Sequence, residues 1–290
     1  MPNVSVLSDI ACELGEGPTY DPHTDTLWWF DIVGRKLFSW QFAEGRLEVQ
    51  ELPFMASVLA RIDDRRQLIV AEDGIYVRER ANGTLSLHLP LEADNPVTRS
   101  NDGRVHPCGA LWVGTMGKKA EDKAGSIYWF LAGELRCIYP GISIPNSICF
   151  SPDGALAYFT DTQTNRIMRV ACDPASGLPT GEPELFFDNE GERGWPDGSV
   201  CDAEGNVWNT RWAGNALDKI SPQGERLLSI AMPASRTSCP AFVGREANRF
   251  AVTSARQGMD EAARAAETRA GFTFLVDVPV KGRFEPDVKL

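Results

Sequence analysis

Four polar residues recur at a fixed distance before a repeated turn in the sequence. Glu16, Asn101, Asn146 and Asp197 each lie five residues before a segment rich in Asp, Gly, Pro or Asn, within otherwise apolar stretches that favour β-strands. Carboxylate and amide oxygens without a thiolate are the ligands that hard cations such as Ca²⁺, Mg²⁺ and Mn²⁺ prefer. The pattern indicates either a divalent metal site or a polar channel whose side chains bond one another and buried water.

The same count from two further turns ends at Val58 and Cys239, which we interpret as packing groups. A free cysteine at such a position could act as a nucleophile, but no histidine occupies an equivalent position to activate it. The histidines fall in or beside predicted turns and outer strands: His23, His88 and His106. No Ser/His/Asp arrangement, GxSxG elbow, Walker loop or GxGxxG motif that opens a helix is present to indicate another chemistry.

Arg99 precedes Asn101 by two residues, so both side chains should share one face of a strand. A guanidinium there would bring a fixed positive charge to the same site. The alternative is an arginine that extends its charge to solvent or forms an ordinary ion pair.

The elements that carry these residues come from a repeat. Six segments share a polar turn followed by a short run of β-branched and aromatic residues, and most continue into a second hairpin, as in RKLFSW followed by EGRLEVQEL. The turns are aligned on Asp21, Asp63, His106, Ser151, Asp202 and Gly244, at intervals of 42 to 51 residues. Four-stranded units of this length predict an all-β chain, folded as one six-bladed β-propeller domain over residues 1–290.

In a propeller, the fifth residue before each turn lies near the start of a blade's innermost strand and can face the central axis. The prediction is therefore a six-bladed propeller of four-stranded blades with an axial metal site. Two stacked β-sandwiches are the alternative, and they would need a linker near the middle of the chain. Residues 130–160 contain no Ser/Gly/Pro-rich or charge-biased break, which favours the propeller.

The tripeptide Pro-Asp-Gly occurs twice, and its place in the repeat separates the two copies. Asp153 lies inside its aligned turn, whereas Asp197 lies five residues upstream of the turn DAEGN. We therefore predict that Asp153 is a turn residue and that Asp197 is a channel residue.

One segment departs from the β pattern. Residues 259–270, MDEAARAAETRA, are rich in Ala, Glu and Arg, with an acidic first turn and a basic last turn before Gly271. They predict a short helix inserted in the last unit, which is either a lid or a solvated surface insertion without a role.

Composition narrows the possible partners. Forty acidic against 29 basic residues give a net charge of -11, which repels nucleic acid and anionic lipid. The first twenty residues resemble no signal peptide, and no stretch is apolar enough to cross a membrane. Seven cysteines without a CxxC pair argue against a disulfide framework and a thiolate zinc site. We expect a soluble, cytoplasmic protein that binds neither nucleic acid nor membranes.

Five ordered motifs at blade spacing identify a family resemblance: GEGPTYDPHTDTLWWFDI, RSNDGRVHPCGALWVGTMG, IPNSICFSPDGALAYFTDT, GWPDGSVCDAEGNVW and SCPAFVGREANRFAVTSA. From about residue 12 to residue 278 the chain resembles the senescence-marker-protein/gluconolactonase/luciferin-regenerating-enzyme family, which includes regucalcin. The resemblance implies a six-bladed propeller with one divalent metal ion on its axis, which could be Ca, Zn, Mn or Mg, and hydrolysis of sugar-acid lactones as the activity.

The resemblance also implies roles for single residues. Glu16, Asn146 and Asp197 match the family's metal ligands, and Arg99 and Asn101 match its substrate-binding RxNDG motif. An acidic residue after GTM also approaches the substrate, and here Glu121 is preferred to Asp122. The departures are PNSI where SNGL is frequent and VHPCG where VDPxG is usual, and they touch strand and turn residues rather than ligands.

The implied reaction is attack of an activated water on a metal-polarised lactone carbonyl, with Asp197 as general base. Three alternatives remain open at this point. The chain could be a noncatalytic calcium-binding protein of the regucalcin type, a protein-interaction propeller, or a metal-dependent esterase or phosphotriesterase. A metal site with only three or four oxygen ligands leaves coordination positions for water or substrate, which favours catalysis.

Overall fold

The computed structural model describes residues 2–290, which contain 24 β-strands, one α-helix and a short 3₁₀ helix. The strands form six antiparallel sheets of four strands each. This confirms the prediction of an all-β, six-bladed β-propeller with four-stranded blades. The chain divides into two compact units, residues 1–51 with 189–284 and residues 52–188 with 285–290, and each unit is described by itself.

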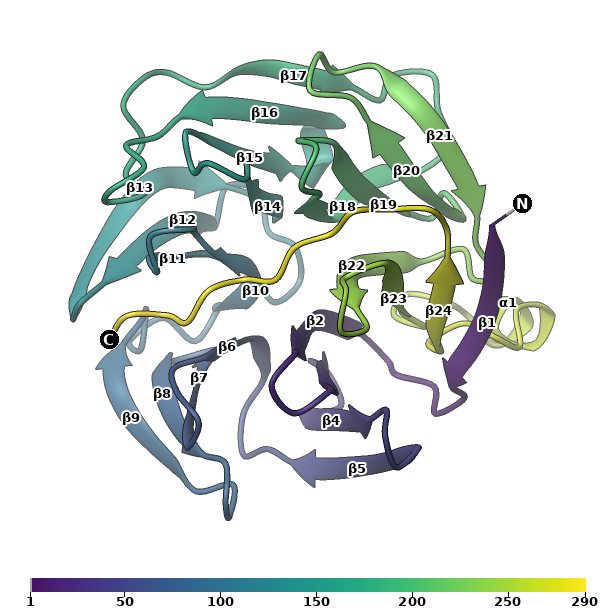
Figure 1. Ribbon diagram of the computed structural model, residues 1–290, viewed down its shortest axis with the longest axis horizontal. Coiled ribbons are helices and arrows are strands. Elements are labelled where there is room, and N and C mark those ends of the chain that lie inside the picture. Colours follow the sequence, from purple (N-terminus) through teal and green to yellow (C-terminus); the bar gives the residue numbers. More distant parts are fainter. Residues whose placement is uncertain (1) are drawn as a thin grey trace. The chain divides into compact units, whose positions relative to one another are not determined.

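The first unit contains three sheets (Figure 1). One sheet has the order Gly15–Asp21 (β2), Thr26–Asp31 (β3), Lys36–Gln41 (β4) and Arg46–Glu51 (β5). A second has the order Trp195–Cys201 (β18), Val207–Trp212 (β19), Ala216–Ile220 (β20) and Arg226–Ala231 (β21). The third has the order Thr237–Val243 (β22), Arg249–Ser254 (β23), Thr273–Asp277 (β24) and Asn3–Ser8 (β1).

The second unit also contains three sheets, each built from consecutive strands. They are Ala56–Arg61 (β6), Arg66–Ala71 (β7), Gly74–Glu79 (β8) and Leu85–Pro90 (β9); Thr98–Val105 (β10), Leu111–Gly117 (β11), Gly125–Leu131 (β12) and Glu134–Ile142 (β13); and Pro145–Phe150 (β14), Leu156–Asp161 (β15), Arg166–Ala171 (β16) and Glu184–Asp188 (β17). The 3₁₀ helix, Thr162–Thr164, follows β15.

The sequence of each strand reflects its place in its sheet. First and second strands are buried on both faces, as in β6 (ASVLAR) and β7 (RQLIVA), so they contain nearly continuous apolar runs. Fourth strands such as β9 (LSLHLP) and β5 (RLEVQE) are mostly exposed and mix charged or polar residues with apolar ones. The gradient from apolar to polar strands produces the repeat seen in the sequence.

The last blade is completed by the N-terminus, which the repeat did not predict. Strand β1 pairs antiparallel with β24, with Val4 opposite Val276, and the two strands lie side by side in Figure 1. Residues 278–290 form no strand. Pairing the first strand with the last strand of the chain gives the sheet its fourth strand and leaves no exposed edge at β24.

The helix predicted over residues 259–270 is shorter in the structure, Glu261–Ala266 (α1), and begins with Asp260, whose side chain accepts a hydrogen bond from Ala263 N. None of its six residues is buried, so no packing extends it. At its end, Glu267 turns away and accepts a hydrogen bond from Ser235 N at 3.0 Å. No helix in residues 2–290 is long and apolar enough to cross a membrane.

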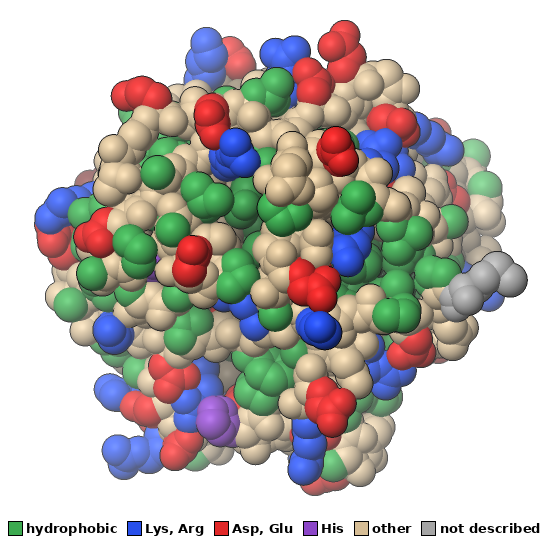
Figure 2. Space-filling model, turned by 45° about the horizontal axis from the view of Figure 1, so that its top comes forward, with side chains coloured by type: hydrophobic (Ala, Val, Ile, Leu, Met, Phe, Trp, Pro, Cys, Tyr) green, Lys and Arg blue, Asp and Glu red, His purple; other side chains and the backbone are tan. Residues whose placement is uncertain are grey.

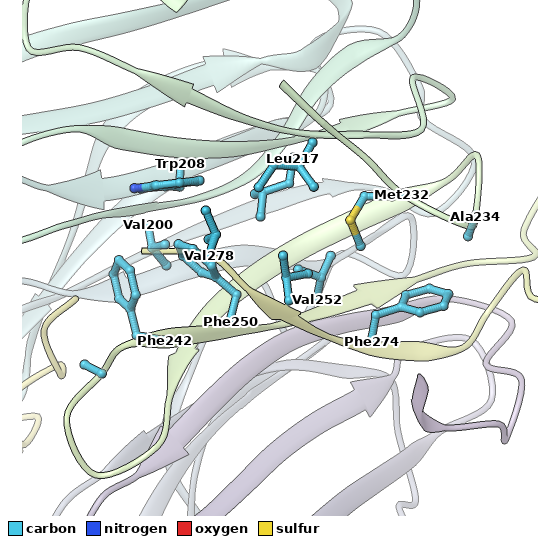
Figure 3. Packing of buried hydrophobic residues seen from close by; sticks show 13 residues of the cluster. Val200, Trp208, Leu217, Met232, Ala234, Phe242, Phe250, Val252, Phe274 and Val278 are labelled. Atoms are coloured by element: carbon cyan, nitrogen blue, oxygen red, sulfur yellow. The ribbon is translucent and has the colours of Figure 1, made fainter. Parts of the chain in front are cut away.

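Aromatic and aliphatic side chains fill the space between neighbouring sheets within each unit. In the first unit, Trp208, Phe242, Phe250 and Phe274 belong to one cluster (Figure 3), and the ring centroids of Trp208 and Phe250 are 4.7 Å apart. Truncation of such a fully buried phenylalanine to alanine costs about 3–5 kcal/mol. On the molecular surface shown in Figure 2, acidic and basic side chains are interspersed.

Candidate metal and substrate site

Strands β2, β6, β10, β14, β18 and β22 each begin one of the six sheets and are called first strands here. A register shift near the start of each first strand determines where the predicted site residues lie. In β2 the shift falls between Glu16 and Thr19, and in β14 it falls between Asn146 and Cys149. The remaining four first strands have a comparable irregularity. A β-bulge of this kind redirects side chains and interrupts pairing, which suits a strand whose start presents polar groups.

The predicted residues occupy two neighbouring positions at these bulges. Glu16 and Asn146 are the last paired residues before the bulge, opposite Phe30 and Thr160. Asn101 and Asp197 are the first residues inside the bulge. All four side chains are buried, with 4–8% of their surface exposed.

In the second unit, hydrogen bonds connect the side chains of three predicted residues in a row, which we call the Arg99–Asn101–Asn146 network. Arg99 Nη1 donates to Asn101 Oδ1 at 2.8 Å, and Asn101 Nδ2 donates to Asn146 Oδ1 at 2.9 Å. Asn146 Nδ2 in turn donates to Thr162 Oγ1 at 2.9 Å. These bonds fix the orientation of each side-chain amide, and they place the Asn101 Nδ2 group against the side-chain oxygen Oδ1 of Asn146. An amide oxygen has two lone pairs, so that oxygen retains one acceptor position.

Asp102 holds the Arg99–Asn101–Asn146 network in place, although no motif in the sequence singled it out. Its Oδ1 accepts from Gly103 N at 2.9 Å and its Oδ2 accepts from Ile148 N at 2.7 Å. Burial raises the pKa of this carboxyl from 3.8 to about 6, against the lowering effect of Arg104 and of the two backbone hydrogen bonds. One buried carboxylate thus joins the bulge of β10 to that of β14. The only sign of this role in the sequence was an acidic residue between Asn101 and Gly103.

The two acidic candidates after β11 differ in their surroundings. Glu121 is half-buried, its Oε2 accepts from Lys119 N at 3.0 Å, and its carboxylate lies against Gly117, the residue that pairs with Thr98 beside Arg99. Asp122 is exposed and accepts from Ser143 Oγ at 3.1 Å. Glu121 therefore lies at the end of the sheet where Arg99 lies, whereas Asp122 fastens the loop to the residues before β14.

In the first unit, glycines next to Glu16 and Asp197 allow the strand starts to bend. Gly17 has a φ of 56°, in the left-handed region, and its backbone nitrogen donates to Glu16 Oε2 at 3.1 Å. A Cβ on Gly198 would lie 2.4 Å from Cys239 Sγ, so only glycine fits after Asp197. Cys239 is fully buried and Val58 is nearly so, which agrees with their predicted packing roles.

The backbone around Asp197 is held by side chains of β19. Asn209 Nδ2 donates to the carbonyl of Asp197 at 3.1 Å and to Ser199 Oγ at 2.9 Å, and Thr210 Oγ1 donates to Gly198 O at 3.1 Å. Asn209 and Thr210 are buried. They satisfy carbonyls that a bulge removes from the ladder, and the sequence analysis did not identify them.

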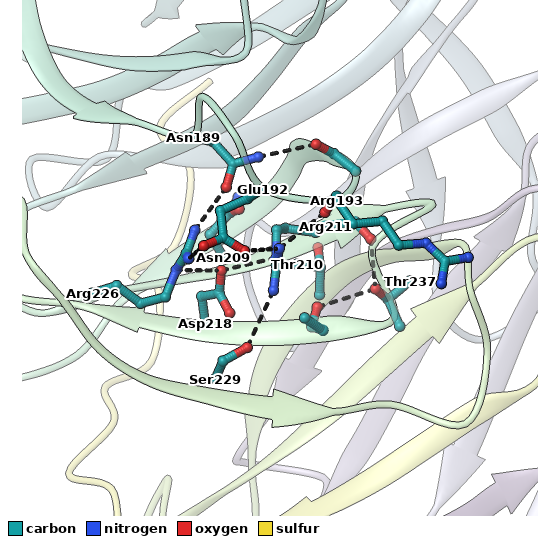
Figure 4. Close-up of polar contacts among 12 residues, drawn as sticks. Asn189, Glu192, Arg193, Asn209, Thr210, Arg211, Asp218, Arg226, Ser229 and Thr237 are labelled. Carbon is teal, nitrogen blue, oxygen red and sulfur yellow. Dashed lines mark hydrogen bonds and ion pairs between the residues drawn. The ribbon is translucent and has the colours of Figure 1, made fainter.

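A buried ionic network holds the loop that leads to Asp197 (Figure 4). Asp218 Oδ2 lies 3.0 Å from Arg211 Nε and 3.1 Å from Arg226 Nε, and Asp218 is 1% exposed. Arg211 Nη1 donates to the carbonyl of Arg193 at 2.9 Å, and Arg226 Nη2 donates to Asn189 Oδ1 at 2.8 Å. The network therefore fastens residues 189–194 to β19 and β21.

The predicted metal ligands fit a hard divalent cation by their chemistry. Glu16 and Asp197 supply carboxylate oxygens and Asn146 supplies an amide oxygen, and all three lie at the starts of first strands in buried positions. No group of three His, Cys, Asp or Glu residues arranged to hold a metal ion occurs within residues 2–290. The predicted set contains two such residues and an amide.

Comparisons with known proteins agree with the family resemblance. A family model described as "SMP-30/Gluconolactonase/LRE-like region" matches residues 14–256. A protein of Rhizobium meliloti named "Putative sugar lactone lactonase" is 53% identical over 98% of this chain and 96% of its own length. The L-arabinolactonase of Azospirillum brasilense is 32% identical over 93% of this chain and 90% of its own length.

Among solved structures, a calcium-binding protein named regucalcin from Agrobacterium tumefaciens is 52% identical. It matches with a TM-score of 0.97 over 98% of this chain and 97% of that chain. A luciferin-regenerating enzyme, 25% identical, matches with a TM-score of 0.92 over the whole of both chains.

Proposed function

Because this chain belongs to the SMP-30/gluconolactonase/LRE-like family, we propose that it is a metal-dependent hydrolase that opens the ring of sugar-acid lactones. Relatives that align over nearly the whole chain are named as sugar lactone lactonase and L-arabinolactonase, and the chain is a lactone-hydrolysing enzyme. The observation that carries the proposal is the buried Arg99–Asn101–Asn146 network, whose hydrogen bonds fix the orientation of two side-chain amides and one guanidinium group.

Glu16, Asn146 and Asp197 are the proposed ligands of one divalent cation. Such a cation polarises a carbonyl and lowers the pKa of a bound water. Thr162 accepts a hydrogen bond from the Asn146 amide nitrogen, so the amide oxygen of Asn146 is the atom available to a cation. That orientation supports a role for Asn146 as an oxygen donor.

Asp197 is the proposed general base. Its carboxylate takes a proton from the attacking water as the new C–O bond to the lactone carbonyl carbon forms. When the ring C–O bond breaks, the same carboxyl returns the proton to the leaving ring oxygen, which becomes the hydroxyl of the open acid. Coordination to a cation lowers the basicity of a carboxylate, so its two roles oppose each other.

Arg99 and Asn101 are the proposed substrate-orienting residues, and Glu121 is proposed as a third. Guanidinium and amide N–H groups donate to hydroxyl oxygens, and a carboxylate accepts from hydroxyl protons. Their support is position: Arg99 contacts Asn101, and the Glu121 carboxylate lies against Gly117 at the same end of the sheet. The proposed substrate class is therefore a polyhydroxylated lactone.

The test is hydrolysis of a panel of five- and six-membered aldonolactones, followed by proton release, with chelator-stripped protein and with Ca²⁺, Mn²⁺, Mg²⁺ or Zn²⁺ added separately. We expect turnover that returns with metal. In Asp197→Asn, we expect turnover to fall by about 10²–10⁴-fold. Full turnover by Asp197→Asn with metal still bound would exclude the base role.

A second candidate is supported by one comparison: the solved relative at 52% identity is described as a calcium-binding protein. On that proposal, calcium is the cation that this chain binds. Calcium binding by calorimetry, with lactone turnover restored by Ca²⁺ rather than by Mn²⁺, Mg²⁺ or Zn²⁺, would favour it. Hydrolysis of an aryl ester or a phosphotriester, tested beside the lactone panel, without hydrolysis of any lactone would instead favour the esterase alternative.

A further inference from the structure

The turn between β10 and β11 holds a thiol and an imidazole in direct contact. Cys108 Sγ lies 3.0 Å from His106 Nδ1. His106 is completely buried, whereas Cys108 is partly exposed. Both residues belong to the segment VHPCG, residues 105–109.

The hydrogen bonds of His106 define which ring nitrogen is the acceptor. His106 Nε2 lies 2.9 Å from the carbonyl oxygen of Gly154, which can only accept, so Nε2 carries the hydrogen. The backbone nitrogen of Cys108 donates to His106 Nδ1 at 3.1 Å. Nδ1 is therefore the acceptor nitrogen, and its lone pair is shared between the Cys108 backbone N–H and the Cys108 thiol, with the ring oriented by Gly154.

Turn capping alone does not require an imidazole here. At the corresponding turns Asp21, Asp63 and Asp202 each accept a hydrogen bond from the backbone nitrogen two residues on, as His106 does from Cys108. A carboxylate is enough for that bond. Histidine retains the cap and adds a base in contact with a thiol.

The surroundings of the pair affect proton transfer in two ways. The His106 ring is enclosed, with its centroid 4.8 Å from that of Phe150 in an edge-to-face arrangement, so a permanent positive charge there is disfavoured. The carboxyl of Asp173 has a lowered pKa, chiefly through hydrogen bonds from Ala175 N and Ser176 and to a lesser extent through His106. A nearby carboxylate stabilises an imidazolium that forms for a short time.

We propose that Cys108 and His106 form a modification site, in which His106 activates the Cys108 thiol toward peroxides and soft electrophiles. A nucleophile, a base in hydrogen-bond contact and a third group that orients the base are the arrangement by which proteins activate thiols. The other cysteines differ: Cys137 is exposed, and the remaining five are buried. Burial raises the pKa of Cys12 and of Cys172 to about 12, which keeps these thiols protonated.

The reaction with hydrogen peroxide balances without a further reactant. The thiol proton passes to His106 Nδ1 as the sulfur attacks one peroxide oxygen, and the O–O bond breaks. The sulfur is oxidised to a sulfenic acid, and the leaving hydroxide takes the proton from the imidazole and becomes water. With iodoacetamide, an S–C bond forms, iodide leaves and the imidazole passes its proton to solvent.

The test compares two cysteines in one folded protein. The full chain is treated with limiting iodoacetamide at pH 7, and the labelling rate of each cysteine is followed by peptide mass spectrometry. We expect Cys108 to react about ten-fold faster than Cys137 or more, because base assistance outweighs the greater exposure of Cys137. Equal labelling, or faster labelling of Cys137, would overturn the proposal.

The matched variant is His106→Asn, which keeps a side-chain acceptor for the Cys108 backbone nitrogen and removes the base. We expect the Cys108 rate to fall to that of Cys137 or below, with the Cys137 rate unchanged. An unchanged Cys108 rate in this variant would contradict the role of His106. Labelling of Cys149 or Cys172 in the variant would report a loosened turn, and His106→Asp, the residue used at the other turns, then gives the same comparison.

Hydrogen peroxide followed by dimedone gives an independent measurement of the sulfenic acid. Dimedone adducts at Cys108, and none at Cys137, are expected in the unmodified chain. Adducts at Cys137 alone would contradict the proposal. Neither measurement uses lactone turnover, so both outcomes are independent of the proposed function.

Discussion

Asp102 Oδ2 accepts a hydrogen bond from Ile148 N at 2.7 Å, and this bond ties the strand that carries Asn101 to the strand that carries Asn146. The other oxygen of the same carboxylate accepts from Gly103 N inside its own bulge. The buried Asp102 carboxylate therefore supports the Asn101–Asn146 contact through the backbone, because both of these hydrogen bonds come from backbone N–H groups rather than from the two side-chain amides. A residue that orients other site residues in this way contributes through them.

The first prediction concerns Asp102→Leu. The variant removes the acceptor of the buried Ile148 N–H and of the partly buried Gly103 N–H, so the free energy of unfolding should fall by about 2–5 kcal/mol. Lactonase kcat/KM should fall by about 10–100-fold at temperatures where the variant is folded, because Asn101 and Asn146 lose their support. Urea unfolding and steady-state kinetics measure the two effects.

The control for this prediction is Asp153→Asn. Asp153 is an exposed turn residue that accepts from Ser151 Oγ and Ala155 N, as its place in the repeat predicted. Its kinetics should match those of the unmodified chain. If Asp102→Leu also retained full kcat/KM while folded, Asp102 would have no positioning role.

The second prediction is a pH dependence of stability through Asp102. Burial raises its folded pKa to about 6 from an ordinary 3.8, so the folded state binds more protons than the unfolded state between these values. Its contribution to stability is therefore greatest below about pH 4 and declines as pH rises to about 6, by on the order of 3 kcal/mol.

Asp102→Asn isolates this effect because asparagine does not titrate. The difference in unfolding free energy, unmodified chain minus variant, should decrease from pH 4 to pH 6 and stay constant above pH 7. Urea titrations at half-unit pH steps measure the difference. A difference that increased with pH would show that the folded pKa is depressed, as in a salt-bridged aspartate.

The sequence predicted the blades because each contains its own turn and its own gradient from buried to exposed strands. It also placed Glu16, Asn101, Asn146 and Asp197 at the starts of first strands, which the structure confirms. The count from the turns was inexact by one residue. Three residues separate Asp202 from Asn206, whose backbones bond across the turn, whereas four separate Asp21 from Thr26, so equal counts do not end at equivalent bulge positions.

The features that the sequence did not predict depend on contacts between distant segments. The pairing of β1 with β24 joins residues about 270 positions apart, and no local pattern encodes it. Asp102 and Asn209 look like ordinary turn and strand residues until the bulge exposes the backbone groups that they bond. The contact of His106 with Cys108 needs the turn geometry, so the sequence showed only an unusual pair of letters.

The third prediction concerns removal of the metal. If Glu16, Asn146 and Asp197 bind a cation in the folded state alone, then added metal should raise the unfolding free energy by about 2.7 kcal/mol at one hundred times its dissociation constant. Thermal unfolding of chelator-treated protein, with increasing Ca²⁺ or Mn²⁺, measures the shift. Glu16→Gln, which removes one ligand charge, should need more metal for the same shift. Melting that ignores every divalent ion, at concentrations that restore activity, would place the metal elsewhere.

The fourth prediction concerns the ionic network around Asp218. Asp218→Asn removes a buried charge that lies between Arg211 and Arg226, and Arg211 has only 8% of its side chain exposed. Loss of one partner from a buried ion pair costs about 3–5 kcal/mol because the other charge stays in a poorly solvated position. Glu192→Gln is the matched control, because the Glu192 side chain is 47% exposed and solvent screens its ion pairs, so its loss should lower the unfolding free energy far less than Asp218→Asn does.

The network also predicts an effect on catalysis. Arg211 holds the carbonyl of Arg193, and residues 189–194 lead directly into the strand of Asp197. Asp218→Asn should therefore lower kcat more than it raises KM, at a temperature where unfolding by urea shows the variant to be folded. Loss of stability with an unchanged kcat would show that the network stabilises the fold without positioning Asp197, and loss of both in proportion to the unfolded fraction would lead to the same conclusion.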